Sequence, residues 1–203
     1  MGNRKRVVVT GLFLLAACVP RLPAQNNTAE LFGGYTYAKA NPEAPLPKTN
    51  MHGWVGSAAA FPASWFGVGM EISAVFGNIA PPSGAGGPGL HAKEYSYLAG
   101  PQLRFVNMER VQSSFKLLIG GVFGQVRLDS STTAAAAQQL GAAGYSSFDQ
   151  TKFAALFAVP VDVTITKLMA WRVEPGLYLT DFNKTKQSNF RFSTGLVLRF
   201  GGK

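Results

Sequence analysis

The feature that most constrains the fold is a strict alternation of two kinds of side chain over stretches longer than ten residues. The last stretch runs from Asn189 to Phe200 and reads NFRFSTGLVLRF. Successive side chains of a β-strand point to opposite faces. One face would therefore be small or cationic, and the other would be mostly large and apolar. The two faces are, respectively, Arg191, Ser193, Gly195, Val197 and Arg199, and Phe190, Phe192, Thr194, Leu196, Leu198 and Phe200.

Strand-like segments of this kind recur along the chain, separated by turn-rich breaks. Each has about 11 to 15 residues, whereas strands of soluble proteins average about 5–6 residues. A tilted strand needs about 9–11 residues to cross the hydrocarbon core of a bilayer. The length therefore favours membrane-spanning strands. We predict eight, at about 29–40, 50–61, 66–78, 93–105, 114–128, 151–163, 169–181 and 188–200.

The polar face of these segments is too small and too poor in charge for a water-exposed surface. It consists mostly of Gly, Ala and Ser with isolated charges, and only 14% of all residues are charged, against about a quarter in ordinary soluble domains. Such a face suits a narrow barrel interior. We therefore expect the apolar faces to contact lipid and the small faces to line a lumen. The alternative is a periplasmic β-sandwich with the aromatic face in its core.

The connections between the segments alternate in character. Those after the first, third and fifth segments are long, namely NPEAPLPKT, IAPPSGAGGPGLHA and DSSTTAAAAQQLGAAGYSSFDQ, but the one after the seventh is only FNKTKQ. The others are tighter: PASW, VNMERVQS and TITKL. Outer-membrane barrels have short periplasmic turns, longer external loops and an even strand number. The sequence thus predicts an all-β, eight-stranded antiparallel up-and-down transmembrane β-barrel.

The N-terminus has the features of a secretory signal peptide. A basic start (Arg4, Lys5, Arg6) precedes a short apolar run, and Ala24 is a suitable residue before a cleavage site. We assign residues 1–24 to the signal peptide and 25–203 to the barrel domain. LAAC also resembles the lipobox of bacterial lipoproteins, which would place a diacylglycerol on Cys18, the only cysteine.

Removal of the signal peptide would lower the net charge. Four of the 19 basic residues would leave with it, and 15 − 10 gives a formal charge of +5. No dense Lys/Arg run remains, and export argues against a nucleic-acid partner. We expect no nucleic acid to bind, and we expect outer-membrane lipid to surround a monomer.

The stretches GWVGSAAAFPASWFGVGMEISA, VDVTITKLMAWRVEPGLYLTDF and NFRFSTGLVLRFGG resemble the small outer-membrane β-barrel domain family related to the N-terminal domain of OmpA. The resemblance covers about residues 30–200. It implies a Gram-negative outer membrane and a last strand that the barrel-assembly machinery recognises by a terminal aromatic residue. Gly201, Gly202 and Lys203 follow that aromatic here. The assembly-signal residues would be Phe190, Phe192, Leu198 and Phe200.

Charged residues of the small faces form the candidate site. Glu174 could meet Arg191, and Glu30 could meet Arg199, because these pairs lie on neighbouring strands. Buried charges are tolerated only when they are paired or hydrated. An eight-stranded barrel is just wide enough for side chains to fill it, which favours a polar plug over a gated pore or solute channel. The predicted lumen charges are Glu71, Arg104, Asp162, Arg172, Glu174, Arg191 and Arg199.

The sequence offers little for catalysis. A lipid-modifying enzyme would need a His with a Ser and a carboxylate in reach, and the only local pair is His91 with Glu94. His52 is the other histidine, and two histidines do not make a convincing zinc site. GAGGPG lacks the context of a phosphate-binding loop. We therefore expect no enzyme activity, no cofactor and no metal.

Two features leave the strand details open. Pro101, Pro160 and Pro175 fall inside predicted strands, where each removes a ladder donor. They should mark bulges, local breaks or misplaced strand limits. Segment 114–128 is apolar on both parities, so its facing is not determined by the pattern.

Overall fold

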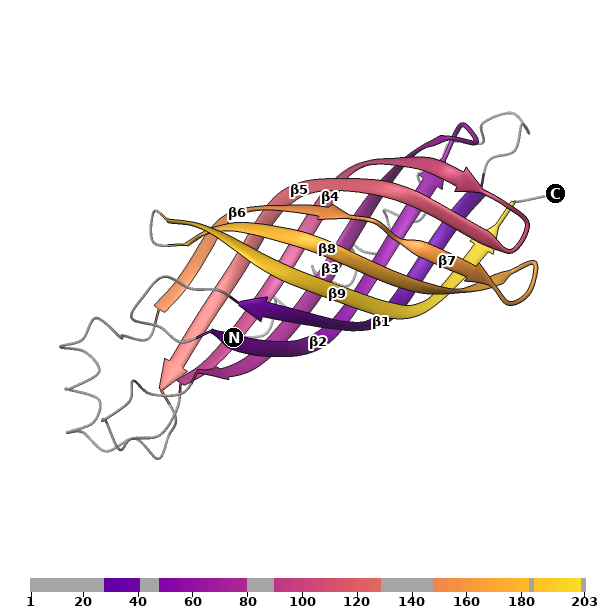
Figure 1. The fold of residues 1–203 in the computed structure, drawn as a ribbon. Helices are drawn as coiled ribbons and strands as arrows, with labels where there is room; N and C mark the ends of the chain where they lie inside the picture. The colour runs from indigo at the N-terminus through magenta and orange to yellow at the C-terminus, as the bar shows by residue number, and fades with distance from the viewer. Residues whose placement is uncertain (1–27, 41–47, 80–89, 129–147, 183–184, 202–203) are drawn as a thin grey trace, which may run out of the picture.

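The computed structural model describes residues 28–40, 48–79, 90–128, 148–182 and 185–201. The predicted signal peptide, Cys18 and Ala24 lie outside these ranges. Figure 1 shows long strands wrapping around one another into an elongated barrel. The part of the chain so described has no helix that is long and apolar enough to cross a membrane.

The observed strands agree closely with the predicted segments. β6 and β7 are one segment of the barrel wall, interrupted at Val159 and Pro160, so the wall has the eight predicted segments. The strands are β1 (Thr28–Ala40), β2 (Thr49–Phe61), β3 (Phe66–Ile79), β4 (Leu90–Asn107), β5 (Val111–Leu128), β6 (Phe148–Ala158), β7 (Val161–Thr164), β8 (Met169–Phe182) and β9 (Thr185–Phe200).

The sheet closes on itself. Each segment pairs antiparallel with the next along the chain, and β9 pairs with β1 from Ala29↔Phe200 to Lys39↔Phe190. A closed sheet leaves no edge strand exposed. The predicted eight-stranded up-and-down barrel is confirmed, and the alternative of a two-sheet sandwich is wrong.

The closing seam depends on a pair of glycines. Gly34 of β1 and Gly195 of β9 are register partners. A Cβ atom on Gly34 would lie 2.2 Å from the carbonyl oxygen of Thr194, and one on Gly195 would lie 2.2 Å from that of Gly33. The two backbones therefore approach so closely that only glycine fits at both positions.

Only one of the three prolines interrupts a strand. Pro160 breaks the strand, but Ala158↔Gly176 and Val161↔Val173 keep one register, so no residue is inserted. β4 and β8 run through Pro101 and Pro175 with the β3–β4 and β8–β9 registers unchanged. The register shift in this part of the wall lies between Arg104 and Val106 of β4.

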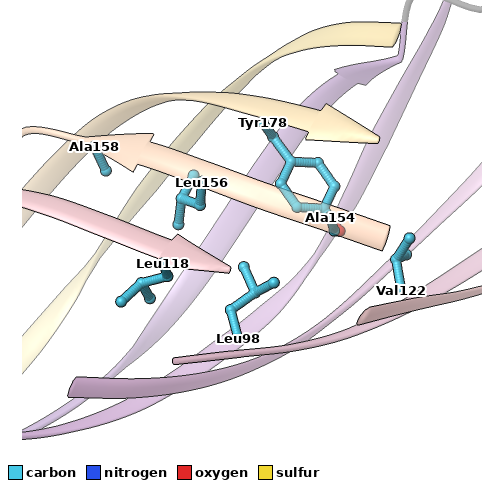
Figure 2. Packing of buried hydrophobic residues seen from close by; sticks show 7 residues of the cluster. All are labelled: Leu98, Leu118, Val122, Ala154, Leu156, Ala158 and Tyr178. Atoms are coloured by element: carbon cyan, nitrogen blue, oxygen red, sulfur yellow. The ribbon is translucent and has the colours of Figure 1, made fainter. Parts of the chain in front are cut away.

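Burial of the large side chains follows the alternation along the strands. Phe115 and Ile119 of β5 are exposed, whereas Lys116, Leu118 and Val122 are buried, which settles the facing of segment 114–128. Figure 2 shows one group of inward apolar side chains, which come from the consecutive strands β4, β5, β6 and β8. This group, here called the apolar cluster, comprises Leu98, Leu118, Val122, Ala154, Leu156, Ala158 and Tyr178.

The outer surface is a broad band of exposed apolar side chains. It includes Leu31, Met70, Ile72, Leu177 and Leu198. Aromatic residues lie towards both ends of the strands, as expected for the interfacial girdles of a membrane barrel. The aromatic side chains of this kind that are exposed or half-buried include Phe66, Phe76, Tyr95, Phe105, Trp171, Phe190 and Phe200.

Candidate functional site: the ion pairs inside the barrel

The barrel interior holds two groups of ion pairs, and within each group the charged side chains are linked to one another. The alternation of the strands places all seven predicted charges on the inner side, together with Glu30 and Lys116. We call the first group the Glu30 ring: Glu30, Asp162, Arg172 and Arg199, with Arg104 attached. The second is the Lys116 chain: Arg191, Glu71, Lys116 and Glu174.

The Glu30 ring alternates acid and base around a closed circuit. Arg172 donates from Nε to Asp162 Oδ1 (2.7 Å), and from Nη2 to Asp162 Oδ2 (2.8 Å) and Glu30 Oε2 (2.9 Å). Arg199 Nη2 donates to Asp162 Oδ2 (2.7 Å), and its Nε lies 3.4 Å from Glu30 Oε1. The two-pronged Arg172–Asp162 contact uses the planar guanidinium fork, the strong geometry for a carboxylate.

Arg104 extends the ring across the lumen. It comes from β4 and donates from Nη2 to Glu30 Oε1 of β1 at 2.5 Å, although β1 and β4 are not paired in the sheet. Its guanidinium carbon also lies 3.5 Å from the centre of the Phe61 ring, a cation–π contact. The space lined by this ring and by Pro160 has no room for a water molecule.

The Lys116 chain is the most deeply buried set of charges. The ammonium Nζ of Lys116 lies 2.6 Å from Glu71 Oε2 and 2.6 Å from Glu174 Oε1. Arg191 Nη2 lies 2.6 Å from Glu71 Oε1, and Arg191 Nε donates to Thr36 Oγ1 at 3.1 Å. The exposed fractions of the side chains of Lys116, Glu71 and Glu174 are 0%, 0% and 2%. These contacts join β3, β5, β8 and β9 through the interior.

The charges of the interior nearly balance. The Glu30 ring has three cations and two carboxylates, and the Lys116 chain has two of each. On the lumen-facing parity, Glu94 of β4 adds a fifth carboxylate and Lys152 of β6 adds a sixth cation. Buried ions are stable only when the attraction between them offsets their lost hydration. Each charge of the two groups meets that condition through at least one ion-pair partner.

Of the two neighbouring-strand pairs expected from sequence, one is found and the other is not. Glu30 does lie near Arg199, but Glu174 contacts Lys116 and Arg191 contacts Glu71. Lys116 was missed because its segment is apolar on both parities. The signal that could have found it is a single charge isolated among apolar residues, which needs a buried partner.

The two histidines lie on the outer side of the barrel. His52 Nδ1 hydrogen-bonds Tyr35 Oη, and His91 Nδ1 lies 2.8 Å from Asn78 Oδ1. Glu94 faces the opposite side of β4 from His91, so the local pair considered from sequence does not form. In the ranges that the structure describes, no three His, Cys, Asp or Glu side chains gather as a metal site.

Comparison with solved structures identifies the fold. Neisserial surface protein A matches with a TM-score of 0.61 at 14% identity, over 87% of this chain and 98% of that one. Ail, the attachment invasion locus protein of Yersinia pestis, matches with a TM-score of 0.58 at 14% identity, over 87% and 100%. No family model and no curated protein sequence matches the chain. The chain therefore has the fold of the small eight-stranded outer-membrane β-barrels.

Proposed function

We propose that the protein is an outer-membrane β-barrel of structural or surface-interaction type with a closed interior. The observation that carries the proposal is that the Lys116 chain and the Glu30 ring connect opposite walls of the lumen. The exposed apolar band supports a lipid environment, because soluble proteins do not leave such a continuous surface in water. Signal-peptide export through residues 1–24 would deliver the chain to the periplasm.

The proposed orientation follows from the connections. The tight turns 62–65, 108–110 and 165–168 lie at one end, which we assign to the periplasm. β1, β3 and β5 end at the other end of the barrel, which would face outward and contact other molecules. In β9, the outward side chains of Phe190, Phe192, Leu198 and Phe200 would present the signal to the barrel-assembly machinery.

Membrane placement and orientation are tested together by cysteine labelling. Lys48→Cys lies at the loop end and Arg110→Cys at the turn end, and both positions are exposed. A membrane-impermeant maleimide should label Lys48→Cys on intact cells and Arg110→Cys only after permeabilisation. The unsubstituted chain, with Cys18 as its only cysteine, is the blank. Recovery of the chain in the soluble periplasm would overturn the proposal.

Closure of the lumen is tested by conductance in planar bilayers. The unsubstituted protein should pass little or no steady current. Glu174→Ala removes one of the two carboxylates of Lys116, so water should enter and brief openings should become more frequent. Glu109→Ala, which removes a carboxylate from an exposed turn, is the matched control. A large steady current that Glu174→Ala leaves unchanged would instead favour a pore.

A lipid-modifying enzyme is the weaker alternative. The hydrogen bonds described for the two histidines join His52 to Tyr35 and His91 to Asn78, whereas a hydrolytic site needs a nucleophile activated by a base. Purified protein incubated with lipid A and phospholipids should leave both unchanged by mass spectrometry. A product that disappears in His52→Ala or His91→Ala would overturn this assignment.

A further inference from the structure

The outer surface of the barrel carries a group of cations at the loop end. Lys39 of β1 and Lys93 of β4 point outward, as does Arg127 of β5, and Lys48 directly precedes β2. All four side chains are exposed. Register places Lys39 opposite Asn50, Lys93 opposite Phe76 and Arg127 opposite His91. We call Lys39, Lys48, Lys93 and Arg127 the cationic rim.

The rim forms no ion pair with any carboxylate whose side chain the structure describes. Of the carboxylates with described side chains, five lie on the inner side of the wall, and Glu109 lies in a turn at the opposite end. Asp149 of β6 and Asp181 of β8 also belong to strands, but their side chains are outside the described ones. No described carboxylate forms an ion pair with Lys39, Lys48 or Lys93. The five inner carboxylates are Glu30, Glu71, Glu94, Asp162 and Glu174.

A belt of aromatic side chains separates the rim from the aliphatic band. All four members of the belt are exposed: Phe76 lies level with Lys93, and Tyr35, Trp54 and Tyr95 lie further from the loop end. Phe76 and Tyr95 meet edge to face, with ring centres 6.1 Å apart. Tyr and Trp concentrate where the acyl chains of a bilayer meet the headgroups. The belt therefore places the rim at the level of the lipid headgroups.

An outward pocket lies within this rim. It has a volume of about 550 Å³, and its lining includes Lys48, Asn50, His52, Phe76 and Asn78. Asn50 Oδ1 accepts a hydrogen bond from Tyr37 Oη at 2.8 Å, which leaves the amide N–H groups of Asn50 for a ligand. Lys39 and Lys93 lie on the strands flanking β2 and β3, one on each side of the pocket.

We propose that this pocket and the cationic rim bind the phosphate groups of a phosphorylated lipid in the outer leaflet. The cations and the Asn50 amide supply charge and donors for the phosphates, and Phe76 connects the pocket to the aromatic belt. The acyl chains then lie on the apolar band below. That continuity with the lipid-facing surface is the reason to assign a membrane lipid rather than a soluble polyanion. The inference rests on the membrane placement proposed above.

The experiment measures binding of diphosphorylated lipid A to the barrel purified in a zwitterionic detergent. Lys39→Gln/Lys93→Gln removes two rim charges, and Arg110→Gln/Lys167→Gln removes two equally exposed charges at the opposite end as the matched control. Each Lys near an anionic surface contributes roughly a factor of five. The rim variant should therefore bind at least about tenfold more weakly, and the control should bind within about twofold of the unsubstituted protein.

Binding measurements with other lipids test whether the phosphate groups are what the rim recognises. Dephosphorylated lipid A and phosphatidylcholine should show little rim-dependent binding, and binding of lipid A should weaken as salt is raised. Equal binding of phosphorylated and dephosphorylated lipid A would overturn the proposal. Rim-dependent binding of soluble inositol hexakisphosphate without binding of lipid A would also overturn it, in favour of a free polyanion.

Failure of this inference is distinguishable from failure of the membrane placement. Heat-modifiable mobility in electrophoresis confirms that each variant is a folded barrel before lipid is added. A folded barrel that passes the cysteine-labelling test but ignores lipid A contradicts only the lipid site. A barrel that is recovered in the soluble periplasm contradicts the placement, and the lipid site with it.

Discussion

The interior of this barrel is filled in two different ways. The Lys116 chain joins four strands by ion pairs between charges that are almost fully buried. Directly beside it, towards the loop end, the apolar cluster fills the same interior with side chains such as Leu118, Leu156 and Tyr178 (Figure 2). Ion pairs require particular partners, whereas apolar packing requires only the right volume. The two regions should therefore respond differently to substitution.

The largest effect should come from removing the cation that two carboxylates share. Lys116→Met leaves Glu174 without its ion-pair partner, and Glu71 with Arg191 alone. Loss of one member of a buried pair costs about 3–5 kcal/mol. Urea unfolding in lipid vesicles, followed by tryptophan fluorescence, measures the loss. Adding Glu174→Gln should restore part of the stability, and a loss that the second substitution leaves unchanged would argue against a charge effect.

The neighbouring apolar residue should be the next most sensitive. Leu118 is fully buried in the apolar cluster, and Leu118→Ala removes its contacts and leaves a cavity, at about 2–4 kcal/mol. The cavity has an apolar lining, so it should stay dry, and the bilayer current should remain as low as in the unsubstituted protein. Leu118→Met is the volume-conserving control, which should cost under about 1.5 kcal/mol. Frequent openings in Leu118→Ala would remove the contrast with Glu174→Ala.

Two adjacent residues of β8 allow the outer, lipid-facing side of the wall to be compared with the interior. Leu177 is exposed on the outer surface and Tyr178 is buried inside. Leu177→Arg should cost about 2–4 kcal/mol if the residue lies near the bilayer midplane. Tyr178→Arg should show a different pattern, because Glu94 on the inner side of β4 is available to pair with a new charge. Equal unfolding free energies for the two variants in vesicles would contradict the assigned facing.

The smallest effect should come from changing the shape of a cation while keeping its charge. Arg104→Lys keeps the attraction to Glu30 but loses the flat contact of the guanidinium with Phe61. Arg and Lys are not equivalent at such stacked sites, and the loss should be about 1 kcal/mol. Arg104→Met, measured in the same urea titration, should cost more. A loss from Arg104→Lys as large as that from Arg104→Met would show that shape, rather than charge, determines the contribution of Arg104.

The alternation of side chains by itself determined the strands and their faces. The number of segments, their approximate limits, the outward apolar side and the inward positions of residues such as Glu71 and Arg191 follow from a two-residue period, which is a local property of the chain. The same reasoning could not assign a face to segment 114–128, because both of its parities are apolar.

Only the tertiary structure decided which charges meet. The pairs Arg104–Glu30 and Lys116–Glu71 join strands that are not neighbours in the sheet. Their distances depend on the diameter and stagger of the closed barrel, and these are set by all the strand registers together. The register shift beyond Arg104 and the unbroken register across Pro160 are likewise properties of pairing. A period of two residues specifies the side of the wall on which a charge lies, but the charge that faces it across the lumen depends on the whole sheet.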